Sequence, residues 1–338
     1  MLFKISLNEN NIFGEWAKLY LEKKKREVNE THYTNLCSIM KHTDFIKDMP
    51  LSQIKPYHID YLLSSHAFNF HTGSVLSKKT LKNIRNIISN VYQFAIEADI
   101  LVRNPAIGRP ISNGVASKKR RALNNLEKRL INQYTDHYMY IAVMIMLHTG
   151  MRRGELIALK WSKVLFDEHK IIVDASVYSE HGKFYLKNGT KTDAGIRVIP
   201  ITNFLKSILI TAKQQSREEY VCHRKNGKMH TENSWIAAWN SYITYLNCCY
   251  YNEKTGENRS VYHPEGINKT IKFTAHMLRH TYATTLYLAD VKIKTAQNWL
   301  GHASASTTMD LYTHIEKSMI DKGALDSLNN YIKNHYSV

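Results

Sequence analysis

The fold of this chain is decided by the stretch from His276 to His314, which reads HMLRHTYATTLYLADVKIKTAQNWLGHASASTTMDLYTH. His276 and Arg279 are three positions apart in a segment of helical periodicity. Both side chains therefore lie on one helix face and can converge on a single anion. Gly301 follows a second apolar segment and is predicted to end a helix there, which places His302 just beyond the helix end.

Hydroxyl residues follow His302, and such residues are typical of the start of a helix. They predict a short helical turn that carries Tyr312. With His276 and His302 counted as the reactive pair, the stretch offers two imidazoles, the guanidinium of Arg279 and the phenol of Tyr312, without a carboxylate pair or a metal cage. A guanidinium can hold two non-bridging oxygens of a phosphodiester, and a phenol can attack its phosphorus, so these groups indicate phosphoryl transfer. The hydroxyl residues are Ser304, Ser306, Thr307 and Thr308.

The order H-x-x-R, L-G-H and distal tyrosine resembles the catalytic box of the tyrosine recombinases, the phage-integrase family. The resemblance implies that Tyr312 is a nucleophile and that His276, Arg279 and His302 surround the scissile phosphate. It also implies a mainly α fold with a small antiparallel sheet. A SAM-like four-helix core-binding domain would precede an α+β catalytic domain, and no cofactor or metal would be needed.

The bulk composition agrees with a DNA-binding protein of two domains. A chain of 338 residues is longer than a domain with a single hydrophobic core usually is, so two domains are expected. The chain has 46 basic and 29 acidic residues, a net charge of +17, which favours a polyanionic partner. Nucleic acid is favoured over a membrane because no single basic amphipathic helix carries the charge. We therefore expect double-stranded DNA as the partner.

Targeting and metal signals are weak. The chain has no apolar run long enough for a transmembrane helix and no signal-peptide pattern, so we expect a cytoplasmic protein without a membrane partner. The four cysteines are too few and too scattered for a disulfide framework. A zinc site at Cys222, His223, Cys248 and Cys249 is disfavoured because adjacent ligands lack the two-residue gap that turns both toward one ion. The remaining cysteine is Cys37.

Residues 1–105 read as a helical core-binding domain. Helical patterns begin near Ile12, near Tyr33 and at Pro56, and Ser77 is a good N-cap for a fourth helix, so the segment predicts a four-helix bundle. Only about ten residues precede the first pattern, so either the protein acts at simple core sites or its start is truncated. Basic residues on the fourth helix are candidates for DNA contacts: Lys78, Lys79, Lys82 and Arg85.

Residues 106–125 lack periodicity and contain no acidic residue, so they read as a basic interdomain linker. The linker could follow a phosphate backbone, or it could be a solvated tether. Its candidate DNA-binding residues are Lys118, Lys119, Arg120 and Arg121.

The catalytic domain is predicted to span 126–338, and it begins with a helical pattern whose apolar segment, 140–147, runs into an arginine motif. Thr149, Gly150 and Arg152 resemble the family's T-G-x-R motif. The glycine is expected to end one helix, so that Arg152 stands at the N-terminus of the next, an anion-receptive position. Glu155, one helical turn later, can bind the guanidinium of Arg152 or a neighbouring backbone amide.

Three β-branched runs, 171–173, 184–186 and 196–201, predict a small antiparallel sheet. Lys191 lies in its last turn, in GTKTDAGIRVIPI, and resembles the family's catalytic lysine on a β-hairpin; Lys187 is the competing candidate.

Residues 202–247 are predicted to be helical, with Trp235, Trp239 and Tyr242 in the core. Residues 248–272 read as an extended polar loop. After Tyr312, an amphipathic C-terminal segment could dock on a neighbouring protomer, as the resemblance implies for a homotetramer on two DNA sites, or on its own domain.

The resemblance and the chemistry together assign roles. Arg152 and Arg279 would neutralise the phosphate oxygens, and Glu155 would support them. His276 would accept the proton of Tyr312. His302 would donate a hydrogen bond to the phosphoryl oxygen, and Lys191 would protonate the leaving 5′ oxygen.

We therefore expect a site-specific recombinase, the integrase of a prophage or conjugative element, that works through a 3′-phosphotyrosine without metal or ATP. A directionality factor is a further candidate partner. A type IB topoisomerase or telomere resolvase shares this chemistry but not the short two-domain layout. The non-enzymatic alternative is a catalytically silent DNA-binding accessory protein of the same fold, which replacement of Tyr312 by Phe would distinguish.

Overall fold

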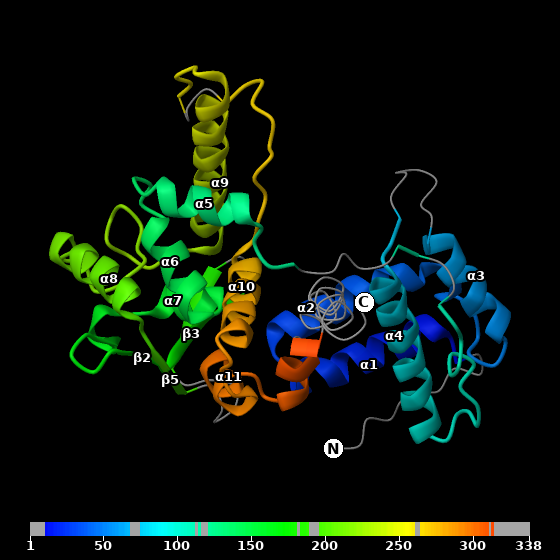
Figure 1. Cartoon of the computed structure of the whole chain (residues 1–338). Helices are drawn as coiled ribbons and strands as arrows, with labels where there is room; N and C mark the ends of the chain where they lie inside the picture. The colour runs from blue at the N-terminus through cyan, green and yellow to red at the C-terminus, as the bar shows by residue number, and fades with distance from the viewer. Residues whose placement is uncertain are drawn as a thin grey trace, which may run out of the picture. The chain divides into compact units, whose positions relative to one another are not determined.

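The structure is a computed structural model that describes residues 11–67, 75–111, 114–115, 121–180, 183–188, 196–260, 264–310 and 312–313. The chain divides into two compact units, Met1–Lys119 and Arg120–Val338. Figure 1 shows the first unit from blue to cyan and the second from green to orange. Within the described ranges, no helix is long and apolar enough to cross a membrane.

The first unit contains the four predicted α-helices. Ser77 begins the fourth helix as predicted, because its side chain accepts a hydrogen bond from the backbone N–H of Thr80 at 3.1 Å. Asn29 begins the second helix in the same way, through the N–H of His32. The helices are α1 (Phe13–Glu27), α2 (Glu30–Met40), α3 (Pro56–Ala67) and α4 (Lys78–Glu97), with a 3-10 turn, η1 (Lys41–Ile46), after α2.

One face of α4 organises the core of this unit. Leu81, Ile84, Ile88 and Val91 recur at steps of three and four and are almost completely buried. Tyr92 is also buried, and its hydroxyl donates to the carbonyl of Leu51 at 3.0 Å, which satisfies its polar group inside the core. The mainly helical first domain expected from the sequence is therefore confirmed.

The second unit is built around a largely buried helix. The helix α6 (Tyr140–Thr149) is apolar over most of its length, which predicts a fully enclosed helix. It contacts α8 and α10, and Figure 1 shows α10 beside the green helices of this unit. The other helices are α5 (Asn125–Gln133), α7 (Arg153–Ala158), α8 (Asn203–Gln215), α9 (Glu232–Thr255), α10 (Ala275–Leu288) and α11 (Ile293–Leu300), with a 3-10 turn, η2 (Trp161–Lys163).

The strands form two antiparallel sheets rather than the single sheet predicted. A three-stranded sheet has the order β1 (Val164–Leu165), β2 (Lys170–Val173), β5 (Arg197–Pro200), with Ile171 opposite Ile199. The run 184–186 belongs instead to β4 (Lys183–Asn188), which pairs with β3 (Ala175–Glu180). The sequence did not show β3, because ASVYSE lacks the apolar alternation of a half-buried strand.

The predicted loop from residue 248 was also wrong at its start, because α9 continues to Thr255 and ends at Gly256 in the left-handed region. Cys248 is only 1% exposed. The side chain of Asn247 fixes this part of the helix by bonding both the N–H and the carbonyl of Ile271, at 2.8 and 2.9 Å. Tertiary pairing of a buried amide therefore extends the helix beyond its apolar pattern.

Candidate active site

The helices α10 and α11 place the first group of predicted residues. His276 and Arg279 lie in the first turns of α10, as predicted. Gly301 ends α11 with φ +63°, and His302 follows directly. Arg279 is 5% exposed, and its guanidinium donates to the carbonyls of Gly150 and Leu300 at 2.7 and 2.6 Å. The guanidinium thus joins the ends of α6 and α11.

Arg152 is the N-cap residue of α7, where the left-handed Gly150 has ended α6. The side chain of Arg152 is half exposed, and its Nη1 donates to Oε1 of Glu155 at 2.8 Å. Its Nη2 donates to the carbonyl of Gly301 at 2.7 Å. Glu155 also accepts the backbone N–H of Arg152 at 2.8 Å, so it binds both the guanidinium and the amide that the sequence offered as alternatives.

Arg197 is the member of this cluster that was not predicted from the sequence. It lies in β5 on the same buried face as Ile199. Its Nη1 and Nη2 donate to Oε1 and Oε2 of Glu155 at 2.9 and 2.7 Å, and its Nε donates to the carbonyl of Trp299 at 2.8 Å. A charged residue on the inward face of an apolar strand was the available signal, because such a residue requires a buried partner.

Three consecutive carbonyls at the end of α11 each accept a hydrogen bond from a different arginine. Trp299 accepts from Arg197, Leu300 from Arg279, and Gly301 from Arg152. The C-terminal end of a helix is negative, so it favours these cations. Three guanidiniums around the single carboxylate of Glu155 leave an excess of positive charge, which makes the site receptive to an anion.

The ionisation of the cluster follows from burial and from these contacts. Burial acts to raise the pKa of Glu155, but hydrogen bonding and charge from Arg197, and then from Arg152, hold it at about 2. Burial and the neighbouring charge of Arg152 lower the pKa of Arg279 to about 9. At neutral pH the carboxylate is therefore ionised and the guanidinium protonated.

His302 is held neutral at the edge of this positive cluster. Its pKa is lowered to about 4, mainly by burial and then by the charges of Arg279 and Arg152. Its Nδ1 lies 2.8 Å from Oγ1 of Thr308, which is completely buried. If the hydroxyl of Thr308 donates to Nδ1, the other ring nitrogen carries the proton and can donate to a substrate oxygen.

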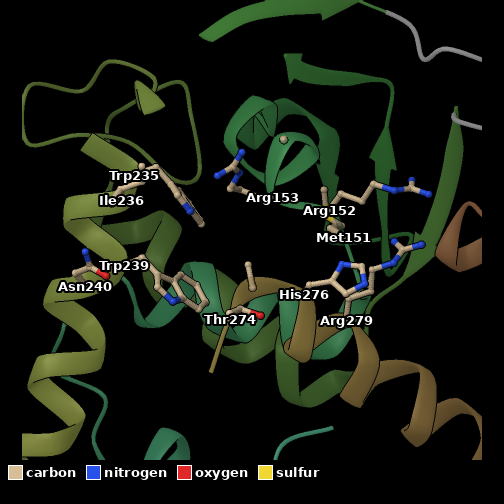
Figure 2. Close-up of a pocket in the computed structure, with 12 residues that line it drawn as sticks. Met151, Arg152, Arg153, Trp235, Ile236, Trp239, Asn240, Thr274, His276 and Arg279 are labelled. Carbon is tan, nitrogen blue, oxygen red and sulfur yellow. The ribbon is translucent and has the colours of Figure 1, made fainter. Parts of the chain in front are cut away.

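A pocket of about 480 Å³ opens beside the arginines. Figure 2 shows Arg152, His276 and Arg279 at one end of the pocket, and Trp235 and Trp239 at the other. The indole N–H of Trp239 donates to the carbonyl of Phe273 at 3.2 Å. The structure therefore brings three of the predicted residues to one solvent-accessible cavity.

Tyr312 lies in an apolar environment rather than among the residues that line this pocket. Its side chain is 6% exposed and packs in a cluster that includes Tyr282, Leu286 and Leu300. The ring of Tyr287 is 5.1 Å away, edge to face. Its hydroxyl has no hydrogen-bond partner among the described residues, and burial raises its pKa. The phenol is therefore held protonated in this conformation.

Several predicted residues lie outside the part of the chain that the structure describes: Lys191, Lys118, Lys119, Arg120 and the C-terminal segment 314–338. The competing Lys187 is exposed on β4. Arg121 forms a two-pronged pair with the buried Glu127, at 2.6 and 2.7 Å.

The predicted basic face of α4 is partly available to a partner. Lys78, Lys79 and Lys82 are exposed, whereas Arg85 donates to the carbonyl of Arg109 at 2.7 Å.

The cysteine-containing region has no built metal site within the described ranges, where no three His, Cys, Asp or Glu side chains are placed to hold an ion. Burial raises the pKa of the Cys222 thiol to about 12. A thiolate, the form that binds metal, is therefore disfavoured there.

Comparison with known proteins agrees with this geometry. The phage integrase family matches residues 115–319, and the phage integrase N-terminal SAM-like domain matches residues 12–65. A tyrosine recombinase XerC-like protein of Caldanaerobacter subterraneus subsp. tengcongensis is 25% identical over 309 residues, which cover 85% of this chain and 73% of the relative.

Solved structures share the fold. The Tn1549 transposon integrase in complex with transposon right end DNA matches with a TM-score of 0.71 and 20% identity, over 91% of this chain and 99% of that chain. A lambda integrase tetramer bound to a Holliday junction matches with a TM-score of 0.58 and 19% identity, over 89% and 78% of the two chains. With a family match over more than half of its length, the chain belongs to the phage integrase family and is a tyrosine recombinase.

Proposed function

We propose that this recombinase cleaves and rejoins DNA strands through a 3′-phosphotyrosine formed by Tyr312, and that it integrates or excises a mobile element. The observation that carries the proposal is the cluster of three guanidiniums, two of which bond the carboxylate of Glu155, beside a pocket that His276 also lines. A positive, partly exposed site of this kind suits a phosphodiester. The mobile-element role rests on the likeness to the Tn1549 transposon integrase.

Arg152 and Arg279 bind the non-bridging oxygens of the scissile phosphate in this proposal. A guanidinium has five N–H donors, and the hydrogen bonds described above use two from each residue. The remaining donors can bind oxygens whose charge grows as the nucleophile attacks. One such donor typically accelerates the reaction about 100-fold to 1,000-fold.

The proton transfers use the histidines and the lysine. His276, at the rim of the pocket, accepts the proton of Tyr312 as its oxygen attacks phosphorus. The bond from phosphorus to the 5′ oxygen then breaks, and Lys191, assigned from the resemblance, protonates the leaving oxygen. The neutral His302 donates a hydrogen bond to the phosphoryl group. Attack by a 5′ hydroxyl reverses these steps and releases the tyrosine, so rejoining needs neither ATP nor a metal.

The proposal requires Tyr312 to leave its apolar cluster before it reacts. A buried phenol with a raised pKa is a poor nucleophile, so the described conformation is a resting one. We propose that DNA binding moves Tyr312 and its neighbours toward the guanidiniums. There, His276 can act as the base and the arginines can stabilise the phenolate.

We further propose that residues 1–105 and 126–338 form the core-binding and catalytic domains and that both bind the duplex, with the linker 106–125 along its backbone. The exposed lysines of α4 and the linker residues then contact phosphates. Assembly is a homotetramer on two sites through the C-terminal segment, a proposal supported by the likeness to the lambda integrase tetramer on a Holliday junction. A directionality factor would bias integration or excision.

The test mixes the protein with a nicked duplex from the sequence flanking its gene, without added metal, and separates the products on a denaturing gel. We expect a protein–DNA adduct that is absent in Tyr312→Phe, while both proteins bind the duplex. The buried position of Tyr312 favours one alternative, a DNA-binding accessory protein without catalysis. Tight binding of the duplex with no adduct would support that alternative.

A further inference from the structure

The contacts of Glu155 pose a problem for a phosphate clamp. A carboxylate beside an arginine normally forms a two-pronged pair, with both oxygens on the guanidinium. Such a pair would commit both oxygens of Glu155, and the full carboxylate charge, to Arg152 and so weaken its attraction for a phosphate. In this structure Arg152 donates to Glu155 through only one guanidinium nitrogen, and its other terminal nitrogen donates to the carbonyl of Gly301.

The two-pronged pair is made with Arg197 instead. Both terminal nitrogens of Arg197 bond Glu155, at 2.9 and 2.7 Å, and its Nε bonds the carbonyl of Trp299. The side chains of Arg197 and Glu155 are 5% and 4% exposed. Arg197 is covered by the turn at Gly301, where an added Cβ would meet its Nη1 at 2.9 Å. Buried in this way, Arg197 does not line the pocket and acts through Glu155.

We infer that Arg197 is a positioning residue of the phosphate clamp: by bonding both oxygens of Glu155, it shares the carboxylate charge, prevents a closed pair between Glu155 and Arg152, and keeps the positive charge of Arg152 directed to the scissile phosphate. The same guanidinium ties the end of α11 to β5, through Trp299. That end also supplies the carbonyls that hold Arg152 and Arg279. The inference rests on the proposed function, because it assigns how the recombinase presents its arginine.

The decisive comparison is between Arg197→Met and the double variant Arg197→Met with Glu155→Gln. Methionine removes the charge and both donor nitrogens of Arg197, so we expect Glu155 to form the two-pronged pair with Arg152. Glutamine has the shape of glutamate without its charge, so the double variant also removes the carboxylate that competes with the phosphate for Arg152. We expect the rate constant for adduct formation to fall about 100-fold in Arg197→Met and to recover about tenfold in the double variant.

Two further readouts separate positioning from a merely structural role. The reaction is run as a single turnover with saturating protein on the nicked duplex. A loss of folded protein then lowers the amplitude, whereas loss of the clamp lowers the first-order rate constant. The dissociation constant for the duplex should stay within about threefold, because contacts along the whole backbone dominate binding. The rate of Arg197→Met relative to wild type should also increase as the pH falls and Glu155 is protonated, and the double variant should lack this relative increase.

Arg129→Met is the matched control, because Arg129 also binds a glutamate through two nitrogens, Glu253 at 3.0 Å, but lies outside the cluster. We expect it to cleave at the wild-type rate. If Arg197→Met does not fold, Arg197→Lys replaces it: the charge stays, but one ammonium cannot bond both oxygens of Glu155, so a fall of about tenfold is expected.

Three results would overturn the inference: a rate within about threefold of wild type in Arg197→Met (or in Arg197→Lys where it replaces that variant), no recovery in the double variant, or changes confined to the amplitude. If the wild-type protein forms no adduct while it binds the duplex, the proposed function is wrong and the role of Arg197 falls with it. An adduct in the wild type with an unimpaired Arg197→Met refutes the role of Arg197 alone.

Discussion

Gly150 is the position at which a single added methyl group should do the most damage to the site. Its φ of +64° lies in the left-handed region, where a non-glycine residue costs about 1–2 kcal/mol. An added Cβ would also lie 2.6 Å from the ring of Tyr282 and 2.9 Å from Leu300. Overpacking of this kind costs typically about 1–3 kcal/mol more, so Gly150→Ala should lower the free energy of unfolding of the second unit by about 2–5 kcal/mol.

Gly256→Ala provides the control, because Gly256 has a similar φ of +74° but no heavy atom within 4 Å of an added Cβ. Gly256→Ala should lower the free energy of unfolding by about 1–2 kcal/mol, because only the left-handed backbone conformation is penalised. Both variants are unfolded in urea and followed by tryptophan fluorescence, since Trp161, Trp235 and Trp239 lie in the second unit. Equal losses of stability in the two variants would refute the argument that the close packing at Gly150 fixes the end of α6.

Further predictions concern ionisation, the histidine and DNA affinity. The pKa of Glu155, about 2, lies below the ordinary 4.5, so its carboxylate contributes stability that is present above pH 4.5 and is lost as the pH falls toward 2. That contribution is on the order of 3 kcal/mol, and acid unfolding of Glu155→Gln should lack this pH dependence. Thr308→Val removes the hydroxyl beside His302 and should slow single-turnover cleavage about tenfold with duplex affinity unchanged; a wild-type rate would contradict this role. Replacing Lys78, Lys79 and Lys82 with Gln should reduce the slope of log binding constant against log salt concentration by about three, as measured by fluorescence anisotropy. An unchanged slope would show that α4 does not contact the DNA.

The helices that frame the site could be predicted because their signals are local. The spacing of Leu81, Ile84 and Ile88 marks the buried face of α4, and Ser77 marks its first turn. Gly150 and Gly301 could be placed at helix ends because each adopts the left-handed conformation that glycine tolerates. These signals depend on neighbouring residues alone, so one sequence is sufficient to find them.

The features that the sequence did not reveal depend on partners far along the chain. The role of Arg197 comes from Glu155 and Trp299, which lie 42 and 102 positions away. The length of α9 depends on the pairing of Asn247 with Ile271, and β3 is a strand because β4 lies beside it. The residue composition of each segment does not predict those long-range contacts.

The packing of the Tyr312 side chain was the other feature that could not be predicted from the sequence. Its sequence context predicted a helical turn, and residues 305–310 and 312–313 are helical. Whether the phenol faces the guanidiniums or packs against Tyr282 and Leu286 depends on how that turn sits on α10 and α11. A motif identifies the nucleophile of a reaction, whereas the packing around it decides when it can react.

If Tyr312 is the nucleophile, its phenol becomes joined to DNA during cleavage. The most direct measurement is mass spectrometry of the adduct after nuclease and protease digestion, which locates the nucleotide on a peptide. We expect a 3′-linked nucleotide on the peptide that contains Tyr312, attached to Tyr312 itself. A nucleotide attached to any other residue, such as Tyr287 or Tyr282, would contradict it.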